Sequence, residues 1–123
     1  MKRHTIREAP VSGQPAYVAN GFVGLRVGIC PFTGQRALLA GFTGSHEDVG
    51  VEALAPVPPV EIDLAMDGSS LHRHPDGYRL VEQTYDFGCG ELTTRFTFTN
   101  RRGQRLSGTH LIYASRSSPT MVI

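Results

Sequence analysis

Residues Glu91–Thr99 alternate between two kinds of side chain, and this alternation constrains the fold more than any other feature of the chain. Successive side chains of a strand point to opposite faces, so period-two alternation predicts a strand with one buried face. Threonine and phenylalanine, which favour strands, make up most of the segment. The predicted core face carries Leu92, Thr94, Phe96 and Phe98, and the other face carries Thr93, Arg95, Thr97 and Thr99.

Two more strands are predicted beside it in the sequence, at about Tyr78–Phe87 and Arg105–Ala114. The intervening segments, Gly88–Gly90 and Asn100–Gly103, consist largely of residues that favour turns. Because short turns join antiparallel neighbours, the three strands should form a meander.

A further alternating run covers Val60–Met66 and predicts an amphipathic strand. Asp67-Gly68 follows it and suits a tight reversal between antiparallel strands. Nothing downstream of Val60 repeats at helical spacing. The predicted fold class is therefore all-β, an antiparallel β-sandwich. The core face of this run would carry Val60, Ile62, Leu64 and Met66.

The first half of the chain has glycine- and proline-rich loops between short apolar runs. Gly41–Pro59 is predicted to be a long connection and not a pair of strands, because the proline run Pro56–Pro59 cannot donate hydrogen bonds within a central strand. Residues 1–16 are predicted to be an amino-terminal arm, and residues 17–123 to be the domain. The terminal Thr120–Ile123 resembles the opening of another strand, which predicts a truncated chain that self-associates through its sheet edges.

Charge and hydropathy exclude several kinds of partner. Twelve Lys+Arg against eleven Asp+Glu give a net charge of +1 without runs of like charge, which argues against nucleic acid and anionic membranes as partners. No apolar stretch follows the basic amino terminus, so neither a signal peptide nor a membrane helix is predicted and the chain is expected to be cytoplasmic. Cys30 and Cys89 are far apart in the sequence and are expected to be reduced, partly buried thiols.

His72 and His74 form the most suggestive metal-binding pair, because alternate strand positions would place both imidazoles on one face. A cupin-like site would need a nearby glutamate and a later histidine. Here Asp76 lies in a turn-like segment, Glu82 comes late, and His110 is the one histidine beyond. We therefore expect exposed histidines on a hairpin, with no metal and no cofactor.

Paired carboxylates could act as general acid and base in sugar hydrolysis, which needs two carboxyl groups roughly 5 to 10 Å apart. Glu61 with Asp63, and Glu47 with Asp48, are the available pairs. Both are expected to be solvated side chains, and no catalytic residue is predicted. Neither a GxSxG elbow nor a phosphate-binding glycine pattern is present.

The segment Tyr17–Cys30, YVANGFVGLRVGIC, is the most distinctive of the chain. Asn20-Gly21 predicts a tight turn. Arg26 is a lone charge among apolar residues, and two interpretations stay open for it. Its side chain reaches solvent along the sheet surface, or it contacts another domain or a sugar.

Ala19–Val27, ANGFVGLRV, resembles the signature "NG-aromatic-aliphatic-G-x-R" near the start of glycoside hydrolase family 65 proteins. This family comprises maltose, trehalose and kojibiose phosphorylases, acid trehalases and related α-glucosidases, including glucosylgalactosyl-hydroxylysine glucosidases. Further similar segments follow in the family's order: Leu39–Phe42, Ala55–Ile62 and Arg116–Pro119. The resemblance covers residues 17–123.

The resemblance implies that the chain is the first part of an amino-terminal β super-sandwich, a partial sandwich without catalytic residues. The partner would be the family's (α/α)6 catalytic barrel, which cleaves an α-glucosidic bond with inversion. Val27 separates Arg26 from Gly28, which is more similar to the hydrolase branch than to the phosphorylases. If this chain contacts an α-glucoside, the candidate residues are Asn20, Phe22 and Arg26.

The alternative is a stand-alone carbohydrate-binding or protein-interaction module. Sugar-binding faces usually stack an aromatic ring on the pyranose. Tryptophan is absent, so this function would fall to the four tyrosines, Tyr17, Tyr78, Tyr85 and Tyr113.

Overall fold

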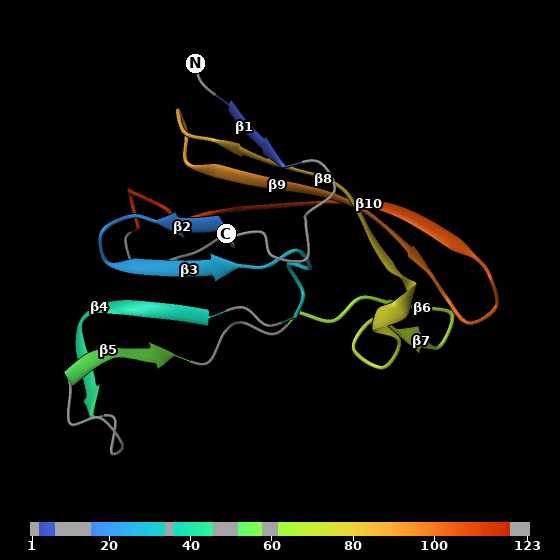
Figure 1. Ribbon diagram of the computed structural model, residues 1–123, viewed down its shortest axis with the longest axis horizontal. Helices are drawn as coiled ribbons and strands as arrows, with labels where there is room; N and C mark the ends of the chain where they lie inside the picture. The colour runs from blue at the N-terminus through green and yellow to red at the C-terminus, as the bar shows by residue number, and fades with distance from the viewer. Residues whose placement is uncertain (1–2, 7–15, 34–35, 46–51, 58–61, 119–123) are drawn as a thin grey trace.

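The computed structural model describes residues 3–6, 16–33, 36–45, 52–57 and 62–118. They form two four-stranded antiparallel sheets and a small two-stranded hairpin (Figure 1), which confirms the predicted all-β, sandwich-like class. The first sheet has the order β1-β8-β9-β10 and the second β2-β3-β4-β5. The strands are β1 Arg3–Ile6, β2 Ala16–Ala19, β3 Val23–Val27, β4 Arg36–Ser45, β5 Glu52–Val57, β6 Ala65–Met66, β7 Ser69–Ser70, β8 Tyr78–Asp86, β9 Glu91–Thr99 and β10 Arg105–Tyr113.

The predicted three-stranded meander is confirmed. Strands β8, β9 and β10 pair antiparallel in sequence order, with ends within one residue of those expected. Gly90 and Gly103 take positive φ values of 74° and 80° in the connecting turns, where other residues would be strained. The predicted core face of β9 is buried along its length, namely at Leu92, Thr94, Phe96 and Phe98.

Strand β8 contains a β-bulge that the sequence pattern did not predict. Leu80 and Glu82 pair with consecutive residues of β9, so Val81 is an extra residue. A bulge shifts the alternation of the strand by one position. Strict alternation from Leu80 would point Glu82 into the core, whereas the structure buries Gln83 and leaves Val81 45% exposed.

One hydrophobic cluster joins the two large sheets. Strands β2 and β3 lie against the first sheet near the carboxyl end of β10 (Figure 1). The side chains that meet there are fully or almost fully buried. They are Val18, Leu25 and Val27 from the second sheet, with Leu92 and Ile112 from the first.

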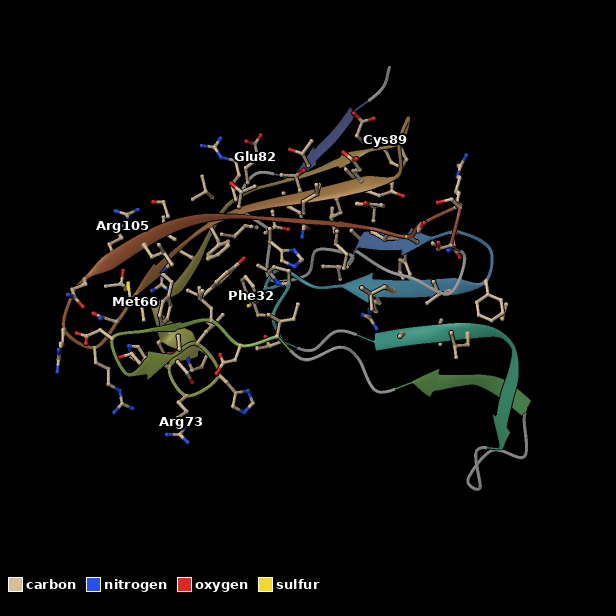
Figure 2. The ribbon with its side chains drawn as sticks, turned by 180° about the vertical axis from the view of Figure 1, so that it is seen from behind. Phe32, Met66, Arg73, Glu82, Cys89 and Arg105 are labelled. Atoms are coloured by element: carbon tan, nitrogen blue, oxygen red, sulfur yellow. The ribbon has the colours of Figure 1, made fainter. Side chains whose placement is uncertain are left out.

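A second cluster covers the other half of the first sheet. Leu71, Phe96 and Phe98 form its buried centre. Phe32 approaches Phe96 edge-on with 5.1 Å between ring centroids, and Met66 of the β6–β7 hairpin packs alongside (Figure 2). The long strands of the meander are thus covered by β2–β3 at one end and by the β6–β7 hairpin at the other.

The strand predicted at Val60–Met66 is wrong in length, because β6 comprises only Ala65–Met66. Leu71 N–H donates to Leu64 C=O at 2.7 Å and extends the β6–β7 ladder by one pair. Ile62 lies outside the ladder and is 48% exposed, so it does not face the core. The Asp67-Gly68 reversal is confirmed, with φ values of 47° and 76°. Val60 and Glu61 lie outside the described residues.

The long connection predicted at Gly41–Pro59 is also wrong, because β4 continues to Ser45 and pairs with β5. Pro56 is opposite Leu38 within this pair. An edge strand tolerates proline because only one of its sides needs donors. Within the described part of the chain, β5 is the last strand of its sheet.

Part of the predicted amino-terminal arm belongs to the first sheet. Arg3–Ile6 forms β1, which pairs antiparallel with β8 from Asp86 to Gln83. Residues 1–2 and 7–15 lie outside the described part of the chain, and the domain boundary at residue 17 stays a prediction.

Candidate functional site

Asn20, one of the three predicted contact residues, is engaged in the fold. Its Oδ1 accepts the N–H groups of Phe22 and Val23, both at 3.0 Å, and closes the β2–β3 turn. Its Nδ2 donates to the backbone carbonyl of Ser115 at 2.6 Å. Gly21 supports the predicted tight turn with a φ of 93°. Asn20 therefore fixes the hairpin to the chain beyond β10.

Arg26 and Phe22 are available at the surface of the same hairpin. Arg26 is exposed on the outer face of β3, opposite Tyr17 of β2 in the register. Tyr17 is 55% exposed and Phe22, at the turn, 37%. Residues of opposite burial alternate along β3, so Val23, Leu25 and Val27 are buried while Arg26 faces out. The hairpin thus presents an aromatic ring and a guanidinium on one outer face, with a second aromatic ring at its tip.

The other three tyrosines are less accessible. Tyr78 is partly buried, stacks on Phe96 with 5.6 Å between centroids, and donates its hydroxyl hydrogen to Ile29 C=O at 2.7 Å. Burial raises the pKa of this hydroxyl above its usual range. Tyr85 packs against Phe87 in a T-shaped arrangement with 4.5 Å between ring centroids. Tyr113 is partly buried. Tyr17 is therefore the tyrosine best placed for contact with a partner.

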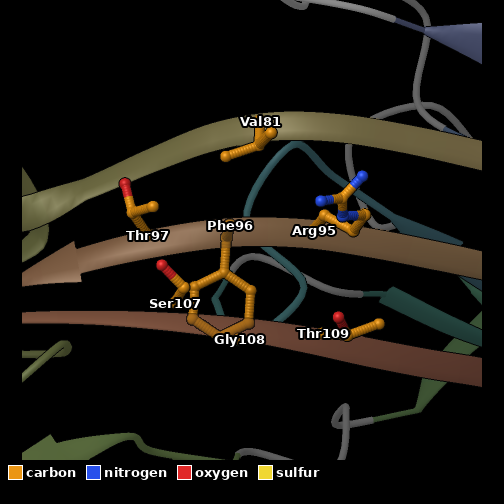
Figure 3. A pocket seen from close by; sticks show the side chains of 7 residues that line it. All are labelled: Val81, Arg95, Phe96, Thr97, Ser107, Gly108 and Thr109. Atoms are coloured by element: carbon orange, nitrogen blue, oxygen red, sulfur yellow. The ribbon is translucent and has the colours of Figure 1, made fainter.

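An open hollow of about 330 Å³ lies on the outer face of the first sheet (Figure 3). Its rim carries the Arg95 guanidinium, which pairs with the Glu82 carboxylate at 3.6 Å. The alternation of β9 predicted that Arg95 and Thr97 share a polar face, but the bulge that brings Val81 to this hollow has no sequence signal. The lining residues are Val81, Arg95, Phe96, Thr97, Ser107, Gly108 and Thr109.

The structure does not place the histidine pair considered for a metal site on a strand. His72 lies in the turn after β7, and His74 directly precedes the short 3-10 helix Pro75–Gly77. Asp63 Oδ1 accepts the backbone N–H of His72 at 3.0 Å, and this hydrogen bond lowers the pKa of Asp63. Among the residues that the structure describes, no three His, Cys, Asp or Glu side chains are grouped to hold a metal ion. Glu47, Asp48 and Glu61 fall outside these residues.

The two cysteines are free thiols, as predicted, but the prediction that both are partly buried is wrong for Cys89. Cys30 is partly buried beside the second cluster, whereas Cys89 is exposed at the β8–β9 turn (Figure 2). Desolvation raises the pKa of the Cys89 thiol, which lowers its thiolate fraction near neutral pH.

A polar row crosses the inner face of the first sheet between the two clusters. Gln83 donates to Thr94 Oγ1 at 3.1 Å and to Gly28 C=O at 3.2 Å. His110 continues the row on β10, packs edge-on against Phe32 at 5.3 Å, and has a buried Nδ1 without a hydrogen-bond partner in the structure. Burial lowers the pKa of His110. Sequence reasoning considered this histidine only for a metal site.

Comparison with known protein families, with characterised proteins and with solved structures finds no match to this chain. Within its described part, no helix is long and apolar enough to cross a membrane.

Proposed function

We propose that this chain is the non-catalytic amino-terminal β-sandwich portion of an α-glucoside-cleaving enzyme similar to glycoside hydrolase family 65. In that enzyme it would pack on an (α/α)6 barrel, which would supply the catalytic groups for hydrolysis or phosphorolysis. The supporting observation is the outer face of the β2–β3 hairpin. This hairpin, which contains most of the segment that carries the resemblance, buries Val23, Leu25 and Val27 and exposes Tyr17, Phe22 and Arg26.

These three exposed side chains suit contact with another domain. Tyrosine and arginine are enriched at the energetic centres of protein interfaces, because each combines a large contact area with hydrogen bonding. A guanidinium also binds carboxylates in a bidentate geometry. We propose that Arg26 pairs with an acidic side chain of the barrel while Tyr17 and Phe22 pack against it. The two free thiols are compatible with a reducing, cytoplasmic compartment.

The coding sequence downstream of Ile123 provides the first test. The proposal expects a reading frame that continues into a helical barrel. In that longer enzyme, Arg26→Ala should lower the melting temperature, whereas Arg105→Ala, another exposed arginine but on the first sheet, should not. In the 123-residue chain both variants should melt like the parent. Equal effects of the two variants in the longer enzyme would contradict docking through the hairpin.

A stand-alone carbohydrate-binding module is the second candidate, and the hollow on the first sheet favours it. The hollow is lined by the hydroxyl groups of Thr97, Ser107 and Thr109 and by the Arg95 guanidinium, which can hydrogen-bond sugar hydroxyls. Titration of the 15N-labelled chain with maltose, trehalose and kojibiose distinguishes the candidates. Saturable shifts at Arg95 and Ser107 would support the module, whereas no shift is expected for a portion that only docks. Cleavage of any of these sugars by the chain alone would refute both proposals.

A further inference from the structure

We propose that two copies of this chain associate by antiparallel pairing of their β10 strands, which would make one continuous eight-stranded sheet. The inference is independent of the proposed function, since it rests on the edge of the first sheet and not on the β2–β3 hairpin. Among the strands that the structure describes, β10 is the last of this sheet, and it is nine residues long. Its amino-terminal half extends beyond the second sheet (Figure 1).

The edge lacks the features that usually prevent such pairing. Natural sheets protect their edges with prolines, lysines, bulges or very short strands. Arg105–Tyr113 contains neither proline nor lysine, and its register with β9 runs without a shift. By contrast, the opposite edge strand β1 has four residues, and β5 of the second sheet contains Pro56.

The hydrogen-bond pattern shows which residues of β10 face the free edge. Asn100 N–H donates to Gln104 C=O at 2.9 Å, in line with the β9–β10 register. Because hydrogen-bonded and non-hydrogen-bonded pairs alternate in antiparallel ladders, the even-numbered residues of β10 bond to β9. The N–H and C=O groups of the odd-numbered residues then point away from it. These are Arg105, Ser107, Thr109, Leu111 and Tyr113.

A two-fold axis at Thr109 satisfies this pattern in both copies. Thr109 would face its own counterpart, and Ser107 would face Leu111. Arg105 would face Tyr113, so the two arginines would lie about 27 Å apart and would not repel each other appreciably. No like charges oppose each other in this register.

The inner face of β10 also gains from the pairing. Its inward residues Leu106, Gly108 and His110 are only partly buried, whereas the inward residues of β9 are buried. In the proposed register Leu106 would face Ile112 of the second copy, so two apolar side chains would lie side by side. The second copy would therefore extend the apolar layer beneath the sheet.

Charge substitutions at the axis test this register. Sedimentation of the parent chain should show a monomer–dimer equilibrium. Thr109→Lys and Thr109→Glu each place like charges directly opposite and should each weaken dimerisation about five-fold or more at low salt. An equimolar mixture should restore it through the mixed dimer. Thr109→Ala should behave like the parent, since it keeps the edge N–H.

A backbone measurement provides an independent readout. In the dimer, the amides of Ser107, Thr109 and Leu111 should exchange with deuterium more slowly as protein concentration rises. Thr109→Pro should abolish the dimer, because proline removes an edge donor without removing a β9–β10 hydrogen bond. A parent chain that remains monomeric at about 1 mM would overturn the proposal, as would a dimer whose affinity does not respond to the charge variants.

Discussion

Two residues of β10, Gly108 and His110, lie where the first sheet is tightly packed. At Gly108, an added Cβ would lie 2.6 Å from the Phe96 ring. That ring cannot easily move, because Phe32 packs against it in a T-shaped arrangement and Tyr78 stacks on its face. At His110, a polar nitrogen is buried without a hydrogen-bond partner in the structure. The sequence alone does not show that position 108 has no room for a Cβ or that the histidine at position 110 is buried.

Gly108→Ala should destabilise the fold by about 1–3 kcal/mol, because overpacking forces the Phe96 ring or the strand to shift. Gly28→Ala is a matched control, since no atom lies within 4 Å of its Cβ position and its φ is not in the left-handed region. Urea unfolding of the two variants measures the difference. Equal stability of both variants would show that the Phe96 ring is free to move.

Protonation of His110 should reduce stability at acidic pH. Its pKa is lowered in the folded chain by burial, so the unfolded chain binds the proton first as the pH falls below the ordinary value of 6.5. The contribution of neutral His110 to the free energy of unfolding is complete above about pH 6.5 and decreases below it. The free energy of unfolding changes by less than about 1.4 kcal/mol per pH unit through this group. His110→Gln should flatten the dependence of the urea midpoint on pH, whereas His72→Gln, at an exposed position, should not.

At the level of whole elements, the strands with strict alternation were predictable and the irregular ones were not. The faces and ends of β9 followed from its sequence because both of its neighbours pair with it along its length. The β4–β5 pair was missed because Pro56 argues against a central strand, and no local signal shows that β5 would be an edge. No local signal shows that β6 would be only two residues long either.

The features of the candidate site that depend on local sequence were predictable, and those that depend on distant residues were not. Exposure of Arg26 follows from alternation along β3, and the Asn20-Gly21 turn follows from its residue types. The bond from Asn20 to Ser115 joins residues 95 positions apart, which no local pattern can reveal. The hollow beside Arg95 depends on the Val81 bulge, whose effect on register comes from pairing with β9.

Deletion of Val81 tests the bulge as an element. The deletion places Glu82 directly after Leu80, and these two residues already pair with consecutive residues of β9. The side chains of the shortened strand therefore keep their faces, and we expect a loss of only about 1 kcal/mol, the ordinary size for a single change. Val81→Thr keeps the extra residue at its exposed position and should stay within about 0.5 kcal/mol of the parent. A loss of several kcal/mol in the deletion variant would show that the fold requires the bulge itself.

At the scale of the whole molecule, the first sheet is stabilised by two separate clusters with a polar row between them. Leu25 belongs to the cluster that attaches the second sheet, and Leu71 to the one that attaches the β6–β7 hairpin. Gln83, Thr94 and His110 form the row that separates them. This division predicts that the two attachments open independently.

Truncation of each leucine tests that independence. Leu71→Ala should cost about 2–5 kcal/mol locally and should speed amide exchange in β6 and β7 while β2 and β3 remain protected. Leu25→Ala should produce the opposite pattern. If either variant accelerated exchange equally in both regions, the molecule would open as a single cooperative unit.

Burial of the Tyr78 hydroxyl, which donates to Ile29 C=O, gives the chain an optical signal for unfolding in alkali. Because the pKa of Tyr78 is raised in the folded chain above its ordinary value of 10.0, stability from this group is complete below about pH 10 and is lost above it. Ionisation of Tyr78 should therefore accompany unfolding. The tyrosinate absorbance of a chain without tryptophan should then rise in two stages, with the later stage absent from Tyr78→Phe.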